Sequence, residues 1–200
     1  MRETKKLSSY LICLVLLVLY SSQIIAGIDE GIAAYNSGDH ATAYNEFLPV
    51  AESGDKKAQL LLGLMYDNGL GIKQDYDQAA KWYRRAAEQG QPRAQFNLGL
   101  MYESGEGIES DQKLAISWVR KSAEQGYAEA QDKLAQYYEK GEYLEQDLVK
   151  SHLWYSLAAS QGARESIAPR NRVASKLSKV QLEESEEMYN AWQNVFQSVF

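Results

Sequence analysis

Cysteine and histidine are scarce in this chain of 200 residues. It has one cysteine, Cys13, and two histidines, His40 and His152. A single cysteine cannot form an intramolecular disulfide, so packing alone must stabilise the fold. The two histidines are far apart in the sequence, and neither has a second ligand at a metal-binding spacing, which argues against a transition-metal site. We therefore expect no metal and no other cofactor.

Positive charge is also in short supply. The chain has 21 lysine and arginine residues against 27 aspartate and glutamate residues, a formal net charge of -6. Because nucleic-acid affinity depends largely on cations that contact phosphates, this balance argues against nucleic acid and favours a basic or neutral partner. Proline is rare, with 3 residues, and no linker rich in Pro, Gly or Ser divides the chain. One continuous core is the simplest expectation.

Near its start the chain has an apolar run that is too short for a typical membrane-spanning helix. The run extends from Tyr10 to Tyr20, whereas a spanning helix needs roughly 20 apolar residues. Residues 1–26 have the features of a secretory signal, with a basic start and with Ile24 and Ala26 at the third and first positions before a cut. Cleavage after Ala26 predicts a periplasmic or secreted protein that has no membrane contact. The alternative is an uncleaved N-terminal membrane anchor, because Ile24 and Ile25 can extend the apolar segment.

Against these absences stands a repeat of 36 residues. Tryptophan occurs four times in the chain, and three of the four are equally spaced. Self-similarity at a period of this length predicts a solenoid, because one helical hairpin cannot bury its own apolar face and must stack on a neighbour. The aligned columns are Ala58, Ala94 and Ala130; Tyr66, Tyr102 and Tyr138; Gly69, Gly105 and Gly141; Asp75, Asp111 and Asp147; Trp82, Trp118 and Trp154; and Gly90, Gly126 and Gly162.

The columns predict two helices in each copy. Gly63 and Gly99, which correspond to Ala135 in the third copy, leave room for the partner helix to approach. A glycine such as Gly69 ends the first helix, and an aspartate such as Asp75 caps the start of the second.

The pattern of these columns resembles the Sel1-like repeat, a relative of the tetratricopeptide repeat with a longer loop inside the hairpin. The resemblance implies an all-α fold, an α/α solenoid of helical hairpins wound into a right-handed superhelix. The implied parts are a signal at 1–26, a degenerate N-terminal repeat or cap at 27–56, repeats at 57–92, 93–128 and 129–163, and C-terminal capping helices at 164–200.

The C-terminal part is expected to cover the open end of the last repeat. Ser178 as N-cap, Gln181 as its capping-box partner and a contact from Leu177 to Leu182 define the start of the final helix. The apolar residues expected to form the cover are Val180, Met188, Ala191, Trp192, Val195 and Phe196. Alternatively, Phe196 and Phe200 dock another protein.

Motifs for catalysis are weak. Ser53 to Lys56 and Ser110 to Lys113 have the Ser-x-x-Lys spacing of penicillin-interacting serine enzymes. Both lie in expected loops and lack the accompanying motifs, so chance explains them better. We therefore predict that the protein is not an enzyme.

The resemblance also implies a groove lined by the first helix of each hairpin. Aligned with tetratricopeptide positions, the groove residues are Leu60, Leu64, Asp67, Asn68, Phe96, Leu100, Glu103, Ser104, Asp132, Gln136 and Glu139. These columns vary between copies while the packing columns do not, as expected of a scaffold with a recognition face. The groove would pass from apolar to acidic and suit a basic and apolar peptide. Alternatively, Leu60 and Phe96 pack beneath the cap or neighbouring loops.

The sequence therefore predicts a non-enzymatic adaptor of the bacterial envelope or secreted space that binds a protein or peptide on its concave face. Two alternatives remain at this point. One is an enzyme or accessory protein that acts on envelope glycans or peptides, and the other is a membrane-tethered scaffold.

Overall fold

The computed structural model describes residues 27–199, and within this range it contains helices and no strand. The predicted signal at residues 1–26 and Phe200 lie outside the described residues. No helix of the described range is both long and apolar enough to cross a membrane. The all-α prediction is confirmed.

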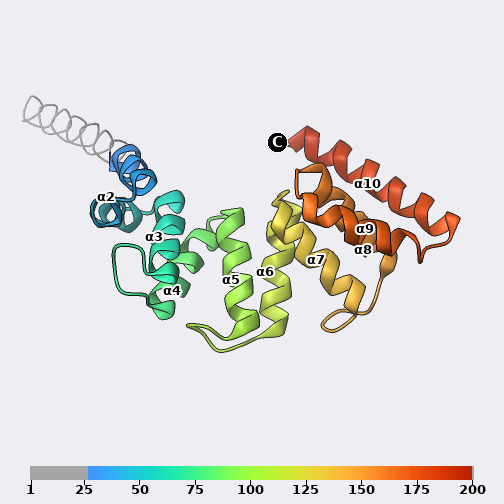
Figure 1. The fold of residues 1–200 in the computed structure, drawn as a ribbon, viewed down its shortest axis with the longest axis horizontal. Helices are drawn as coiled ribbons and strands as arrows, with labels where there is room; N and C mark the ends of the chain where they lie inside the picture. Colours follow the sequence, from blue (N-terminus) through green and yellow to red (C-terminus); the bar gives the residue numbers. More distant parts are fainter. Residues whose placement is uncertain (1–26, 200) are drawn as a thin grey trace, which may run out of the picture. The chain divides into compact units, whose positions relative to one another are not determined.

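The helices follow one another in hairpins that match the predicted copies (Figure 1). A helix over residues 27–37 precedes them. The hairpins are α3 with α4, α5 with α6, and α7 with α8, so the odd-numbered helix is the first of each pair. The bounds are α2 His40–Glu52, α3 Lys56–Asn68, α4 Tyr76–Glu88, α5 Pro92–Ser104, α6 Gln112–Glu124, α7 Ala128–Lys140, α8 Leu148–Ser160, η1 Arg164–Ser166, α9 Ile167–Ala174 and α10 Lys179–Val199.

The structure divides into two compact units, the first ending at Trp82 and the second starting at Tyr83. The sequence predicted one continuous core. In a solenoid each repeat contacts only its neighbours, so the core consists of local clusters. In the first unit, Phe47, Leu62 and Trp82 share one cluster.

The second unit has two clusters. Val119 of α6 and Leu134 of α7 belong to one of them. Ala135, Tyr155 and Val173 join α7, α8 and α9 in the other. Each cluster joins consecutive helices of the chain, as expected when hairpins stack in series.

The repeated tryptophans are buried or half-buried. Trp82 is 7% exposed, and Trp118 and Trp154 are half-buried. Trp154 packs against both clusters of the second unit. The prediction that these side chains anchor the packing is consistent with their positions.

The predicted N-caps are confirmed. Asp75, Asp111 and Asp147 each accept a hydrogen bond from the backbone N–H three residues further on, at 3.0, 3.0 and 2.9 Å. These bonds satisfy amide groups that the helix itself leaves free.

The two helices of the second repeat pack closely at Gly99. A Cβ atom at this position would lie 2.8 Å from Cγ2 of Val119 and 3.1 Å from the carbonyl oxygen of Ala115, both on α6. The equivalent position of the third repeat holds Ala135, which is fully buried. The predicted role of the small residues, to let the partner helix approach, is supported at Gly99.

The loop of the third repeat differs from the other two. Gly71 and Gly107 have φ angles of 72° and 68°, a conformation that side chains rarely adopt. Tyr143 occupies this position in the third copy, and it does not have a positive φ. Its ring instead packs edge-to-face on Tyr137 with centroids 5.6 Å apart. The replacement of glycine therefore changes the backbone path of the loop and leaves the hairpin intact.

One further column of residues repeats with the same period, and its role was not predicted from the sequence. Gln59, Gln95 and Gln131 are buried. In each, Nε2 donates to the carbonyl oxygen of an alanine eight residues earlier, in the preceding helix, at 3.0, 3.1 and 3.2 Å. These bonds join the first helix of each repeat to the helix before it.

The C-terminal helix α10 begins as predicted. Ser178 N–H donates to Oε1 of Gln181 at 3.0 Å, and Gln181 N–H donates to Oγ of Ser178 at 3.3 Å, which confirms the capping box. Phe196 lies against the turn between α6 and α7, because a Cβ at Gly126 would come within 2.6 Å of its ring.

The predicted cover was too broad. Val180 and Val195 are 72% and 64% exposed, and Ala191 is exposed as well. Only part of the apolar stripe of this helix of 21 residues, including Trp192 and Phe196, is half-buried. Val180, Ala191 and Val195 therefore do not form the cover.

Replacing Gln95 with leucine tests the glutamine column. Oε1 of Gln95 accepts a hydrogen bond from Nε2 of Gln125 at 2.6 Å, and Nε2 of Gln95 donates one to the carbonyl oxygen of Ala87. Leucine keeps the bulk but removes both hydrogen bonds of this buried side chain, so Gln95→Leu is expected to lower the free energy of unfolding by about 1–3 kcal/mol. Chemical denaturation measures this loss. The same change at the exposed Gln197 should alter it by less than about 0.5 kcal/mol, and equal effects at the two sites would contradict the role of Gln95.

Candidate functional site

The predicted groove residues of the first unit lie on α3. Leu60 and Leu64 are buried, with 6% and 9% exposed, so they offer a partner little surface. Asp67 is half-buried and Asn68 is exposed. Asn68 Nδ2 donates to the Leu64 carbonyl within the same helix at 2.8 Å. The partner-binding role of these four residues stays a prediction.

The predicted residues of α5 belong to the second unit. Phe96 is half-buried, and its ring packs on Tyr127 with centroids 5.5 Å apart. Leu100 is also half-buried, whereas Ser104 is exposed at the C-terminal end of the helix. Oγ of Ser104 donates to the carboxylate of Glu106 at 3.3 Å. The apolar surface of α5 is therefore partly used for packing and partly open.

Glu103 joins α5 to α7. Its Oε2 lies 2.8 Å from Nζ of Lys133, and both side chains are half-buried. Nζ of Lys133 also lies 5.3 Å from the ring centroid of Tyr137. Burial raises the pKa of Tyr137, and the charge of Glu103 raises it further. The first helices of consecutive repeats are thus connected by an ion pair.

Asp132 connects α7 to the start of the C-terminal part. Its Oδ1 accepts a hydrogen bond from Oγ of Ser166 at 2.5 Å, and its Oδ2 accepts one from Nε2 of Gln136 at 2.6 Å. Ser166 is fully buried. Both oxygens of this carboxylate therefore have partners inside the unit.

Glu139 connects α7 to α9. Arg172 donates to both of its carboxylate oxygens, at 3.1 and 2.8 Å, and the hydroxyl of Tyr155 donates at 3.0 Å. Lys176 lies 3.8 Å away. The hydrogen bond from Arg172 lowers the pKa of Glu139, so this carboxylate is held ionised. That state suits a structural ion pair and not a general acid.

We call these residues the first-helix face of the second unit: Phe96, Leu100, Glu103, Asp132, Gln136 and Glu139. Three carboxylates of the predicted groove lie on this face, and the sequence did not predict the cations that pair with them. Lys133 follows Asp132 directly in the sequence, and Arg172 lies 33 residues after Glu139. No pattern in the sequence indicates which cation meets which carboxylate, because that depends on the spacing of helices that are far apart along the chain.

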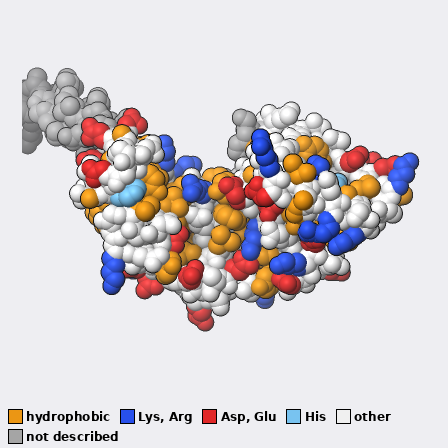
Figure 2. All heavy atoms as spheres, in the orientation of Figure 1, with side chains coloured by type: hydrophobic (Ala, Val, Ile, Leu, Met, Phe, Trp, Pro, Cys, Tyr) orange, Lys and Arg blue, Asp and Glu red, His pale blue; other side chains and the backbone are white. Residues whose placement is uncertain are grey.

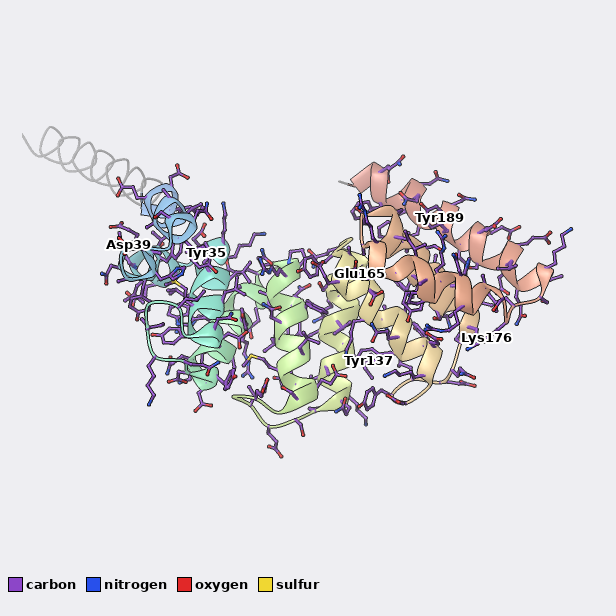
Figure 3. The ribbon with its side chains drawn as sticks, viewed as in Figure 1. Tyr35, Asp39, Tyr137, Glu165, Lys176 and Tyr189 are labelled. Atoms are coloured by element: carbon purple, nitrogen blue, oxygen red, sulfur yellow. The ribbon has the colours of Figure 1, made fainter. Side chains whose placement is uncertain are left out.

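Acidic and basic side chains are interspersed over α7 to α10 on the face shown in Figure 2. Lys176 lies near the end of α9 (Figure 3). Among the residues that the structure describes, no three His, Cys, Asp or Glu side chains are grouped so that they could hold a metal ion. The face offers paired charges around a partly apolar helix, an arrangement suited to binding.

His152, the second histidine, lies between α8 and α10. Its Nδ1 is 2.9 Å from Oγ of Ser185, which is 1% exposed. Burial lowers the pKa of His152, and the nearby charge of Arg170 on α9 lowers it further, whereas Glu186 on α10 opposes this. The ring is therefore held neutral in the fold.

A family profile described as the Sel1 repeat matches residues 56–91, 92–127 and 128–162. A Sel1 repeat protein from Oxalobacter formigenes is 36% identical in sequence, and the match covers 70% of this chain and 58% of that one, with a TM-score of 0.67. A protective antigen present in uropathogenic Escherichia coli strains, which displays an SLR fold, is 34% identical, and the match covers 76% of this chain and 32% of the antigen, with a TM-score of 0.69. No curated protein matches.

The neutral state of His152 predicts a pH dependence. Its folded pKa is below the ordinary value of 6.5, so the unfolded chain binds more protons as the pH falls below 6.5, and stability falls with it. We expect the free energy of unfolding to drop through this interval with a slope below about 1.4 kcal/mol per pH unit, the value for one whole proton. Denaturation at several pH values measures the slope.

His152→Gln should flatten the curve in this interval. Glu139 provides the control, because its folded pKa is below its ordinary value of 4.5 and its contribution is lost only at lower pH. Glu139→Gln should therefore leave the His152 interval unchanged. An equal slope with and without His152 would contradict the neutral, buried ring.

Proposed function

The chain belongs to the Sel1 repeat family, whose repeats generally mediate protein–protein interactions, and we propose that it is a non-enzymatic adaptor. The proposed binding surface is the first-helix face of the second unit. This surface belongs to the second unit alone, and its residues would carry the protein–protein interaction that is general in the family.

The observation that carries the proposal is the contrast between two sides of the same helices. On the side that faces the partner helix, Ala94 and Ala130 are identical and fully buried. On the other side, the position of Phe96 in α5 is held by Asp132 in α7, and both residues are half-buried. Packing constrains the first side, so the second side is free to carry a recognition surface.

The chemistry of this face favours a partner with an apolar anchor. Phe96 and Leu100 supply the partly open apolar surface on α5. The charges beside them are already paired, as in Glu103 with Lys133 and Glu139 with Arg172. Because these carboxylates already have cationic partners, their electrostatic attraction for a basic peptide is reduced. The proposed ligand is a protein segment whose apolar side chains contact α5 and whose polar groups match the charges of α7, the usual arrangement of a specific interface.

Reversing the ion pair between α5 and α7 tests the proposal. Glu103→Lys combined with Lys133→Glu keeps two opposite charges in contact but exchanges their places. The free energy of unfolding should change by less than about 1 kcal/mol, the usual value of such a pair. Affinity for the partner should fall by about tenfold or more, because the charge pattern that the partner meets is inverted.

The partner is first identified with a photo-crosslinking residue at Leu100 in intact cells, and affinities are then measured with the purified partner. A crosslinker at Leu114, 39% exposed on the second helix α6, is the matched control and should give no product with the same partner. Equal products from Leu100 and Leu114, or unchanged affinity in the charge-exchanged protein, would rule out this face as the binding surface.

A further inference from the structure

A cavity of about 570 Å³ lies between α8, α9 and α10. Figure 1 shows α9 and α10 beside α8 at the C-terminal end of the chain, and Figure 3 marks Tyr189, which lines the cavity from α10. The volume is within the range of small-molecule sites in proteins. This cavity is separate from the first-helix face, and the adaptor proposal does not use it.

Two opposite charges line the cavity without pairing. Arg170 of α9 donates from Nε and Nη2 to Oδ1 of its neighbour Asn171 at 3.2 and 3.1 Å. Glu186 of α10 lines the same space. Neither side chain forms an ion pair with any residue that the structure describes. The cationic stretch around α9 is otherwise largely paired, since Arg172 and Lys176 both lie against Glu139.

The rest of the wall is polar and uncharged or apolar. His152 is held neutral and bonded to Ser185. Gln193 connects Ser160 to Tyr189, with bonds of 3.4 and 3.2 Å, and so fixes two hydroxyls of the wall. Ile167 and Leu182 contribute apolar surface. Arginine and glutamate are therefore the two charges that a ligand meets here.

We propose that the cavity between α8, α9 and α10 binds a short zwitterionic peptide, with Arg170 contacting its carboxylate and Glu186 its ammonium group. Balanced charges favour a ligand that carries both signs, and arginine binds carboxylates with paired hydrogen bonds. Because the two side chains do not contact each other, a ligand that pairs with both must hold its own charges apart. The ends of an extended dipeptide are separated by about 7 Å, and the apolar wall accommodates its small side chains.

Isothermal titration calorimetry of the purified protein with alanyl-alanine tests this site. Saturable binding is expected, and both the N-acetylated and the C-amidated dipeptide should bind about tenfold more weakly, because each lacks one charge. Arg170→Gln should weaken binding of the free dipeptide about tenfold. This variant should bind the free dipeptide and the C-amidated dipeptide equally well. Glu186→Gln should abolish its advantage over the N-acetyl form. Arg164→Gln, an exposed cation of η1 that does not line the cavity, is the matched control and should leave affinity unchanged.

A variant that fills the cavity without changing a charge tests the site independently, in case the charge variants do not fold. Ala159→Met extends a side chain into the cavity and should abolish binding while circular dichroism and the melting temperature stay near those of the parent. The proposal is overturned if millimolar dipeptide shows no saturable heat, if all three peptides bind alike, or if binding survives both Arg170→Gln and Ala159→Met.

Discussion

The close contact of two helices at a residue without a side chain is the constraint on which the packing of the second repeat depends. At Gly99 the backbone of α5 comes so near to Ala115 and Val119 of α6 that a Cβ atom would force part of α6 to shift. Such an approach lets the large side chains around it fill the remaining space at the density of a protein interior. The buried sides of α5 and α6 are thereby fixed, and variation is confined to their other sides.

Helix α9 connects the two surfaces proposed to bind ligands. Arg172 pairs with Glu139 on the first-helix face, whereas Arg170 lines the cavity beneath α10. Residues two apart on a helix point in different directions, because each residue turns the helix by about 100°. One short basic helix thus pairs with a carboxylate of the first-helix face and also supplies the cation of the proposed small-molecule site.

The sequence predicted the hairpins, the aspartate caps and the capping box at Ser178 because these features depend on residues a few positions apart. The spacing of Gln59, Gln95 and Gln131 is also 36 residues, so the same repeat could have predicted this buried column. It could not indicate that Lys133 meets Glu103 or that Arg170 and Glu186 share a cavity. Those relations depend on how helices pack across long stretches of chain. The apolar periodicity of α10 also led to the wrong prediction that Val180 and Val195 are buried, because periodicity does not show how much surface lies beneath a helix.

The most direct test of the close-contact constraint is the free energy of unfolding of Gly99→Ala, measured by chemical denaturation. Helix propensity alone predicts that alanine stabilises a helix by about 1 kcal/mol relative to glycine. The contact with α6 predicts the opposite, a loss of about 1–3 kcal/mol from overpacking. A destabilised variant supports the account, and a variant as stable as the parent, or more stable, would contradict it.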